Sequence, residues 1–163
     1  MISRRKFVKR VVVAGSAAAA VAHDAPSAAQ PAGGRIRGYD HVALPMQNTD
    51  AMLAFYRSLG LQVAENPQAV SVYIGTQMIN FHRPATWQRE TFTLRAPAAK
   101  PPCGDLCFVW EGTPEALKAM LDRAKAKTEV GPVERQGGRR RAASSVYTRD
   151  PDGNLLEFMI YSA

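Results

Sequence analysis

The chain has 163 residues, which is room for one domain or two very small ones. Hydrophobic residues make up 46% and charged residues 21%, values that exclude wholesale disorder and a collagen-like chain. Two cysteines are too few for a disulfide scaffold. The net charge of +7 comes mostly from residues 1–22, because the rest of the chain has 16 basic against 14 acidic side chains. The charge therefore does not indicate a nucleic-acid partner.

Residues 1–29 are typical of an export signal. A basic start is followed by an apolar run that is too short to span the ~30 Å of a bilayer core. The adjacent pair Arg4 and Arg5 resembles the twin-arginine export signal. Cleavage is expected after Ala22 or Ala29, at small-residue sites. We therefore expect a periplasmic or extracellular protein with no membrane span after processing.

The folded part is expected at residues 35–163, after a linker at residues 30–34. Within it the order strand, helix and three strands occurs twice, which indicates two similar modules. They are assigned to residues 35–83 and 104–163. An irregular segment is expected to join them.

The first module is predicted from alternation along strands and from helical spacing. Apolar residues follow Met52 at i+3, i+4 and i+7, which indicates a helix capped by Thr49 and ended by Gly60. The strands around it alternate apolar and polar side chains. The expected elements cover residues 39–46, 49–60, 61–64, 70–74 and 78–82.

The second module repeats this order. Thr113 is expected to cap its helix, with Pro114 in the first helical position. A turn is predicted before the last strand, because Pro151 fixes φ and Gly153 accepts positive φ. The expected elements cover residues 105–110, 113–124, 129–133, 144–148 and 155–160.

Each module has one helix and four strands, and neither could cover both faces of its sheet alone. We therefore predict an α+β fold with helices outside and a concave inner face. Strand alternation assigns the following residues to that face: His41, Asn80, His82, Asp105, Cys107, Glu157 and Met159. Imidazole and carboxylate groups suit a divalent ion of Mn, Fe, Co, Ni or Zn. The alternative is a hydrogen-bonded polar cluster without metal.

Several segments resemble the vicinal oxygen chelate (VOC) superfamily, the group of glyoxalases, bleomycin-resistance proteins and ring-cleaving dioxygenases. They are residues 40–44, 55–61, 79–82, 131–133 and 145–157, the last containing Asp-Pro-Asp-Gly-Asn-Leu-Leu-Glu. The resemblance covers residues 35–161 and is greatest to glyoxalase-domain-containing proteins. It implies a cup-shaped fold of two βαβββ modules.

The resemblance also implies roles for the inner-face residues. His41 and Glu157 match ligands of one divalent ion, and Asp105 and His82 would be additional ligands of the same ion. Glu157 would also serve as the catalytic base. Asp105 stands where many metal-dependent members have histidine. Substrate binding is assigned to Asn80, Cys107, Met159 and Arg140. Arg140 belongs to a basic Gly-Gly-Arg-Arg-Arg loop that could attract an anionic substrate or simply be solvated.

Three functions remain open from the sequence. The first is a metal-dependent enzyme acting on a small oxygen-rich substrate, with glyoxalase-like lyase or isomerase chemistry. The second is a non-catalytic protein that sequesters a drug or metabolite, and the third is a ring-cleaving dioxygenase. A small molecule is the expected partner, and a homodimer is allowed. We expect Cys103 and Cys107 to be thiols, since extended chain would hold their Cα atoms roughly 13 Å apart.

Overall fold

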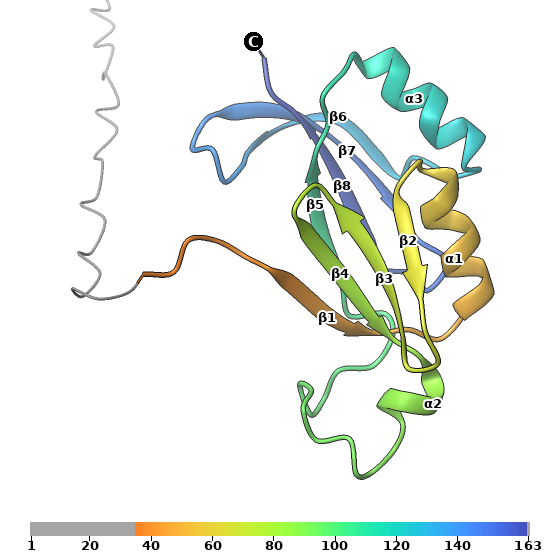
Figure 1. The fold of residues 1–163 in the computed structure, drawn as a ribbon. Helices are drawn as coiled ribbons and strands as arrows, with labels where there is room; N and C mark the ends of the chain where they lie inside the picture. Colours follow the sequence, from red (N-terminus) through yellow and green to blue (C-terminus); the bar gives the residue numbers. More distant parts are fainter. Residues whose placement is uncertain (1–34, 163) are drawn as a thin grey trace, which may run out of the picture. The chain divides into compact units, whose positions relative to one another are not determined.

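The computed structural model describes residues 35–162, in which a strand, a helix and three strands occur twice (Figure 1). The first module contains β1 (His41–Pro45), α1 (Thr49–Ser58), β2 (Gln62–Glu65), β3 (Ala69–Ile74) and β4 (Gln77–His82). The second contains β5 (Asp105–Val109), α3 (Pro114–Arg123), β6 (Val130–Gln136), β7 (Ala142–Arg149) and β8 (Leu155–Ile160). The predicted α+β fold of two βαβββ modules is confirmed.

The chain divides into residues 1–37 and a compact unit of residues 38–163, which holds all of these elements. The expected export signal, its cleavage sites and the linker lie outside the described residues. Within residues 35–162, no helix is long and apolar enough to cross a membrane.

The two modules have the same sheet topology. Sheet A has the strand order β1-β4-β3-β2, and sheet B has the order β5-β8-β7-β6. In each sheet the first strand of the module pairs in parallel with the last, and the other pairs are antiparallel. As a result, β1 and β5 are both edge strands, one in each sheet.

The helices form where the spacing predicts them. In α1 the residues Met52, Leu53, Phe55 and Tyr56 are buried, and Gly60 follows the helix at φ 82°, a conformation that favours glycine. In α3 the side chain of Thr113 accepts a hydrogen bond from the backbone N–H of Ala116, at 3.2 Å. Thr113 is therefore the predicted N-cap.

The expected cap of α1 is wrong. Thr49 is already helical, and the residue at the cap position is Asn48, whose side chain makes no capping bond. The carboxylate of Asp152, from the other module, accepts from the backbone N–H groups of Gln47 and Asn48 at 2.7 and 2.8 Å. A distant acid thus holds the two residues that directly precede α1.

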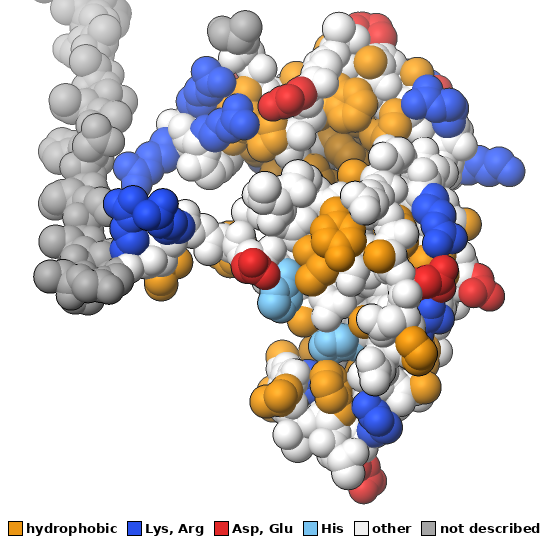
Figure 2. Space-filling model, in the orientation of Figure 1, with side chains coloured by type: hydrophobic (Ala, Val, Ile, Leu, Met, Phe, Trp, Pro, Cys, Tyr) orange, Lys and Arg blue, Asp and Glu red, His pale blue; other side chains and the backbone are white. Residues whose placement is uncertain are grey.

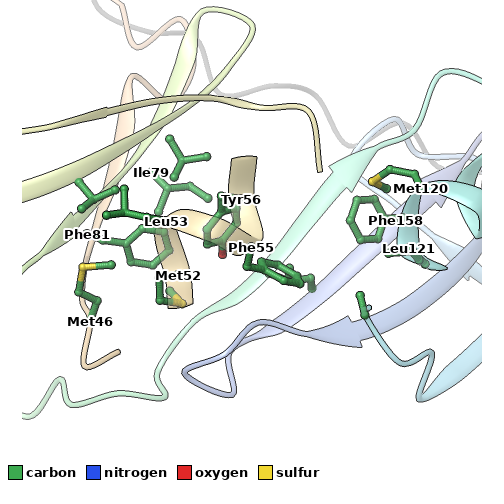
Figure 3. Close-up of a cluster of buried hydrophobic side chains, with 14 of the residues drawn as sticks. Met46, Met52, Leu53, Phe55, Tyr56, Ile79, Phe81, Met120, Leu121 and Phe158 are labelled. Carbon is green, nitrogen blue, oxygen red and sulfur yellow. The ribbon is translucent and has the colours of Figure 1, made fainter. Parts of the chain in front are cut away.

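One hydrophobic cluster contains buried side chains from both modules. Figure 3 shows Phe81 and Met52 of the first module on one side and Phe158 of the second on the other, with Phe55 between them in this view. Tyr56 and Phe81 are at most 1% exposed. The shared cluster agrees with the expectation that neither module has a complete core.

The turn at residues 150–154 connects the modules through polar side chains. The hydroxyl of Tyr56 donates to the buried carboxylate of Asp150 at 3.0 Å. Burial is the main cause that raises the pKa of Asp150, and it also raises the pKa of Tyr56. The amide oxygen of Asn154 accepts from the backbone N–H groups of Cys103 and Gly104, at 3.0 and 2.8 Å. The turn motif therefore has a structural role in holding both modules and the connector.

The connector was expected to be irregular throughout, but it begins with the short helix α2 (Pro84–Trp87). Pro84 stands in its first turn, where a missing N–H is tolerated. The indole of Trp87 donates to the carbonyl of Met46 at 2.8 Å. This bond ties the start of the connector to the end of β1.

Candidate functional site

Sheet A presents polar side chains on the face opposite α1. Ile79 and Phe81 of β4 are buried in the core, so Asn80 and His82 lie on the other face. The amide nitrogen of Asn80 lies 3.4 Å from Nε2 of His82. The predicted orientation of both residues is thus seen in the structure.

A cavity of about 570 Å³ covers this face. Ser71 and Asn80 line it with hydrogen-bonding groups, and Arg89 contributes a cation. The ring of Phe92 meets the ring of His82 edge-on, with centroids 4.9 Å apart. The cavity therefore combines neutral polar groups with an aromatic wall.

His82 and His41 are electrostatically coupled. Burial lowers the pKa of His82, and the positive charge of protonated His41 lowers it further. At neutral pH the His82 imidazole is therefore unprotonated and can accept a hydrogen bond or bind a metal. Histidine side chains appear close together on the face shown in Figure 2. The ring of His41 contacts Asp40, with Nδ1 2.7 Å from Oδ1.

Sheet B carries a second polar group on the face opposite α3. Cys107 on β5 and Tyr147 on β7 lie directly beside Glu157 on β8. Burial, followed by the charge and hydrogen bonding of Glu157, raises the pKa of Cys107 to about 12. The thiol thus stays protonated at physiological pH and is a poor nucleophile. Both cysteines are free, as expected.

Glu157 itself has an unusual environment. Its Oε1 is buried and has no hydrogen-bond partner in the described structure. The same carboxylate contributes to raising the pKa of Tyr147, whose hydroxyl accepts from Nε of Arg135 at 3.2 Å. An unpartnered buried carboxylate oxygen is costly unless a ligand, ion or water binds it.

The edge strands β1 and β5 contribute side chains to one cavity. A cavity of about 470 Å³ lies between β1 and β5 and is lined by His41, Asp105 and Cys107 together with apolar side chains. Val42 also lines this cavity and is 38% exposed. His41 and Asp105 thus line one cavity, although they belong to different modules.

The structure does not gather all predicted ligands around one point. In the described residues, no group of three or more His, Cys, Asp or Glu side chains is close enough to hold one metal ion. His41 and His82 lie on sheet A, whereas Asp105 and Glu157 lie on sheet B. The donor types fit a divalent metal, but they form two separate groups in a single chain.

The remaining predicted substrate contacts differ in their exposure. Met159 is only 3% exposed. It packs against Gly137, where an added Cβ would overlap the Met159 sulfur. Arg140 is exposed, at φ 56°, in the β6–β7 hairpin.

Ser71, Arg89 and Phe92 are among the residues of the sheet A cavity that the sequence reasoning missed. Ser71 carried a usable signal, because it alternates with the core residues Val70 and Val72. Arg89 and Phe92 lie in the connector and have no periodic pattern, so nothing in the sequence placed them.

Two βαβββ modules with a polar concave site define a glyoxalase-type fold. A family model described as the Glyoxalase/Bleomycin resistance protein/Dioxygenase superfamily matches residues 38–158. The chain belongs to this superfamily, as the resemblance in the sequence indicated.

Among curated proteins, the chain is 31% identical over 127 residues to the glyoxalase domain-containing protein RDO1 of Mycosarcoma maydis, covering 77% of this chain and 69% of that protein. It is 32% identical over 124 residues to virulence protein STM3117 of Salmonella typhimurium, covering 75% and 83%. The crystal structure of STM3117 matches with a TM-score of 0.69, 30% identity and coverage of 78% and 99%. A lactoylglutathione lyase from Agrobacterium tumefaciens shares the fold, at 24% identity, a TM-score of 0.57 and coverage of 77% and 94%.

Proposed function

We propose that this protein is a metal-dependent enzyme acting on a small oxygen-rich molecule, with glyoxalase-like lyase or isomerase chemistry. The observation that carries the proposal is the cavity between β1 and β5, where His41 and Asp105 from different modules line one space. Glu157, on the strand next to β5, adds a buried carboxylate oxygen without a partner. Membership of the superfamily supports the same conclusion.

His41 and Glu157 would hold a divalent ion, with Asp105 and His82 completing the shell. These donors suit Mn, Fe, Co, Ni or Zn. A bound ion would act as a Lewis acid on substrate oxygens. The described chain gathers no group of three ligands, so binding requires the two groups to close on the ion or a second copy to supply one of them.

Glu157 is the residue of this chain that we assign to proton transfer. In this proposal Glu157 would accept a proton from a carbon next to a carbonyl and return it to the neighbouring atom. Cys107 does not compete as a nucleophile, since its pKa is about 12. Asn80 and Ser71 can bind substrate oxygens, and the ring of Phe92 supplies an aromatic wall of the sheet A cavity.

A protein that binds a small molecule without turnover is the second candidate. It is favoured by the absence of a three-ligand group in residues 35–162 and by the sheet A cavity, whose hydrogen-bonding groups and aromatic wall suit an organic ligand. A ring-cleaving dioxygenase ranks lower, because Asp105 stands where that chemistry needs a histidine.

A thermal-shift titration of chelator-stripped protein with Mn, Fe, Co, Ni and Zn tests the proposal. A metal that binds only the native state raises the melting temperature, and the rise grows with the metal concentration. We expect one of these ions to raise it, and we expect His41→Ala and Glu157→Ala each to abolish the rise.

Glu111→Ala is the matched control, because Glu111 is an exposed carboxylate outside the candidate site. It should respond like the wild type. The metal-dependent enzyme is excluded if no ion raises the melting temperature of the wild type, or if both site variants still show the rise. The protein that binds a small molecule without turnover is then the function that the structure supports.

A further inference from the structure

A further cavity lies where α1 of the first module meets the chain that leaves α3 of the second (Figure 1). We call it the outer groove. It has a volume of about 590 Å³ and is lined by residues of α1, by residues 123–127 and 129, and by residues 149–151. None of these residues lines the sheet A cavity or the cavity between β1 and β5. The outer groove is therefore separate from the candidate metal site.

Positive charge is concentrated in the outer groove. Arg123, Lys125, Lys127 and Arg149 line it, whereas α1 contributes no charged side chain to it. Outside residues 1–22 the chain has 16 basic against 14 acidic side chains, so an even spread of charge would not produce such a group. The concentration is a local feature of this groove.

The acids that line the outer groove are already bonded. The carboxylate of Glu129 accepts from Nε of Arg149 at 2.9 Å. Asp150 is buried, and its two oxygens accept from the backbone N–H of Asn154 at 2.9 Å and from the hydroxyl of Tyr56 at 3.0 Å. By contrast, Arg123, Lys125 and Lys127 form no ion pair with any residue between 35 and 162. Three cations in the groove are thus left for an external anion.

The backbone that carries the two lysines is held in place. The N–H of Lys125 donates to the carbonyl of Asp122 at 3.0 Å. The fully buried hydroxyl of Thr148 donates to the carbonyl of Lys127 at 2.7 Å. Ala126, between the lysines, is buried. Both ammonium groups therefore extend from a fixed segment, which lowers the entropic cost of binding a ligand.

Lys125 has an unfavourable backbone conformation for a lysine. It follows α3 at φ 54°, the place that Gly60 occupies after α1 at φ 82°. Glycine is the usual residue there, because a Cβ is strained in the left-handed region. A cation near a helix C-terminus is favourable, but Arg123 in the last turn of α3 already supplies one. The end of the helix alone therefore does not account for a lysine at this position.

A phosphate group matches the cations of the outer groove. It carries about two negative charges at neutral pH and three acceptor oxygens, whereas a carboxylate carries one charge on two oxygens. Lysine binds phosphate as a point charge, and arginine adds a planar pair of donors. The volume of the groove leaves room for an organic part beside the ring of Phe55, which also lines it.

We propose that the outer groove binds a small phosphorylated molecule. Arg123, Lys125 and Lys127 hold its phosphate, and its organic part lies against α1. This site goes beyond the proposed function, because it shares no lining residue with the cavities of the candidate metal site. The result of the metal titration therefore does not decide it.

Isothermal titration calorimetry on the full chain tests the proposal with phenyl phosphate and benzoate. These probes have the same ring and differ in the anionic group. We expect phenyl phosphate to bind at least fivefold more tightly. Lys125→Gly and Lys127→Ala should each weaken its binding roughly fivefold, the effect of losing one exposed charge pair. Lys100→Ala is the matched control, because Lys100 is exposed and lies outside the groove, and it should bind like the wild type.

Thermal unfolding without ligand separates binding from a structural role of Lys125. Glycine adopts positive φ without a steric cost, so Lys125→Gly should melt at or above the temperature of the wild type. A lower melting temperature would show that Lys125 serves the end of α3, and would overturn its assignment to the ligand.

The remaining outcomes also decide the proposal. It is overturned if benzoate binds as tightly as phenyl phosphate, if both groove variants bind like the wild type, or if Lys100→Ala loses as much affinity as they do. Sedimentation with phosphatidylglycerol vesicles distinguishes the source of the phosphate. Binding to these vesicles without binding of phenyl phosphate would assign the cations to a lipid surface and overturn the site for a small molecule.

Discussion

At the scale of single residues, strand alternation was sufficient to orient the site. His82 and Glu157 lie on the faces opposite the core because their neighbours on each strand are buried. Distances between side chains on different sheets could not be predicted in this way. They depend on how the sheets are placed, which alternation within one strand does not determine. This is why the sequence indicated one cavity, whereas the structure divides the donors between two sheets.

The lowered pKa of His82 predicts a pH-dependent stability. The His82 imidazole binds its proton less tightly in the folded state than in the unfolded chain. We therefore expect the free energy of unfolding to keep its full value above about pH 6.5 and to fall as the pH drops through the folded pKa. The partly exposed position limits the loss to about 0.5 kcal/mol or less. Urea unfolding of the wild type and of His82→Gln at pH 7 and pH 5 measures it.

His82→Gln should lose less stability on acidification than the wild type. His41→Gln should have a smaller effect in the same direction, because the charge of His41 is the second cause of the shift. Identical slopes for the wild type and His82→Gln would show that the imidazole is not desolvated in solution.

At the scale of secondary-structure elements, prediction worked where the signal was local. The helix ended by Gly60 and the helix capped by Thr113 need only residues within one turn. The start of α1 could not be predicted from its own residues, since the carboxylate that holds the two residues before it comes from about a hundred residues away. The short helix α2 was missed because four residues are too few to show a period.

The distant cap predicts a specific loss of stability. Asp152→Ala should lower the free energy of unfolding by about 1–2 kcal/mol, because it leaves two backbone N–H groups at the start of α1 without their acceptor. Asp152→Asn keeps an oxygen acceptor and should lose about half as much. Chemical denaturation of purified variants measures both.

Asp122→Ala serves as the control for this series. Asp122 forms an exposed ion pair with Lys118 on α3, which contributes at most about 0.5 kcal/mol. A loss at Asp152 no greater than the loss at Asp122 would show that α1 does not depend on the second module for its cap.

At the scale of the whole molecule, the repeat in the sequence was sufficient to predict the architecture. It was not sufficient to predict which side chains form the shared core. Two βαβββ runs predict two similar modules, but the buried cluster depends on Phe55 and its neighbours meeting side chains of the other module. The polar turn at residues 150–154 then fixes both modules to the connector. Such contacts join residues with no pattern of spacing along the chain.

We propose that Arg4 and Arg5 direct the chain through the twin-arginine route to the periplasm or the exterior. Replacing both by lysine keeps the charge but removes the guanidinium pair, so the protein should remain in the cytoplasm. Cell fractionation with immunoblotting measures the distribution. Unchanged accumulation outside the cytoplasm would contradict this route.

The edge strands β1 and β5 have a consequence for solubility. Each is paired on one side only, so its open side could add a strand from another molecule, which is how aggregates begin. His41 and Asp105 place a polar side chain on each of these edges, beside the exposed apolar groups Val42 and Val109. His41 and Asp105, which are proposed as metal ligands, therefore also disfavour the pairing of these edges with another molecule. Variants that replace them with large apolar residues should therefore aggregate before they unfold.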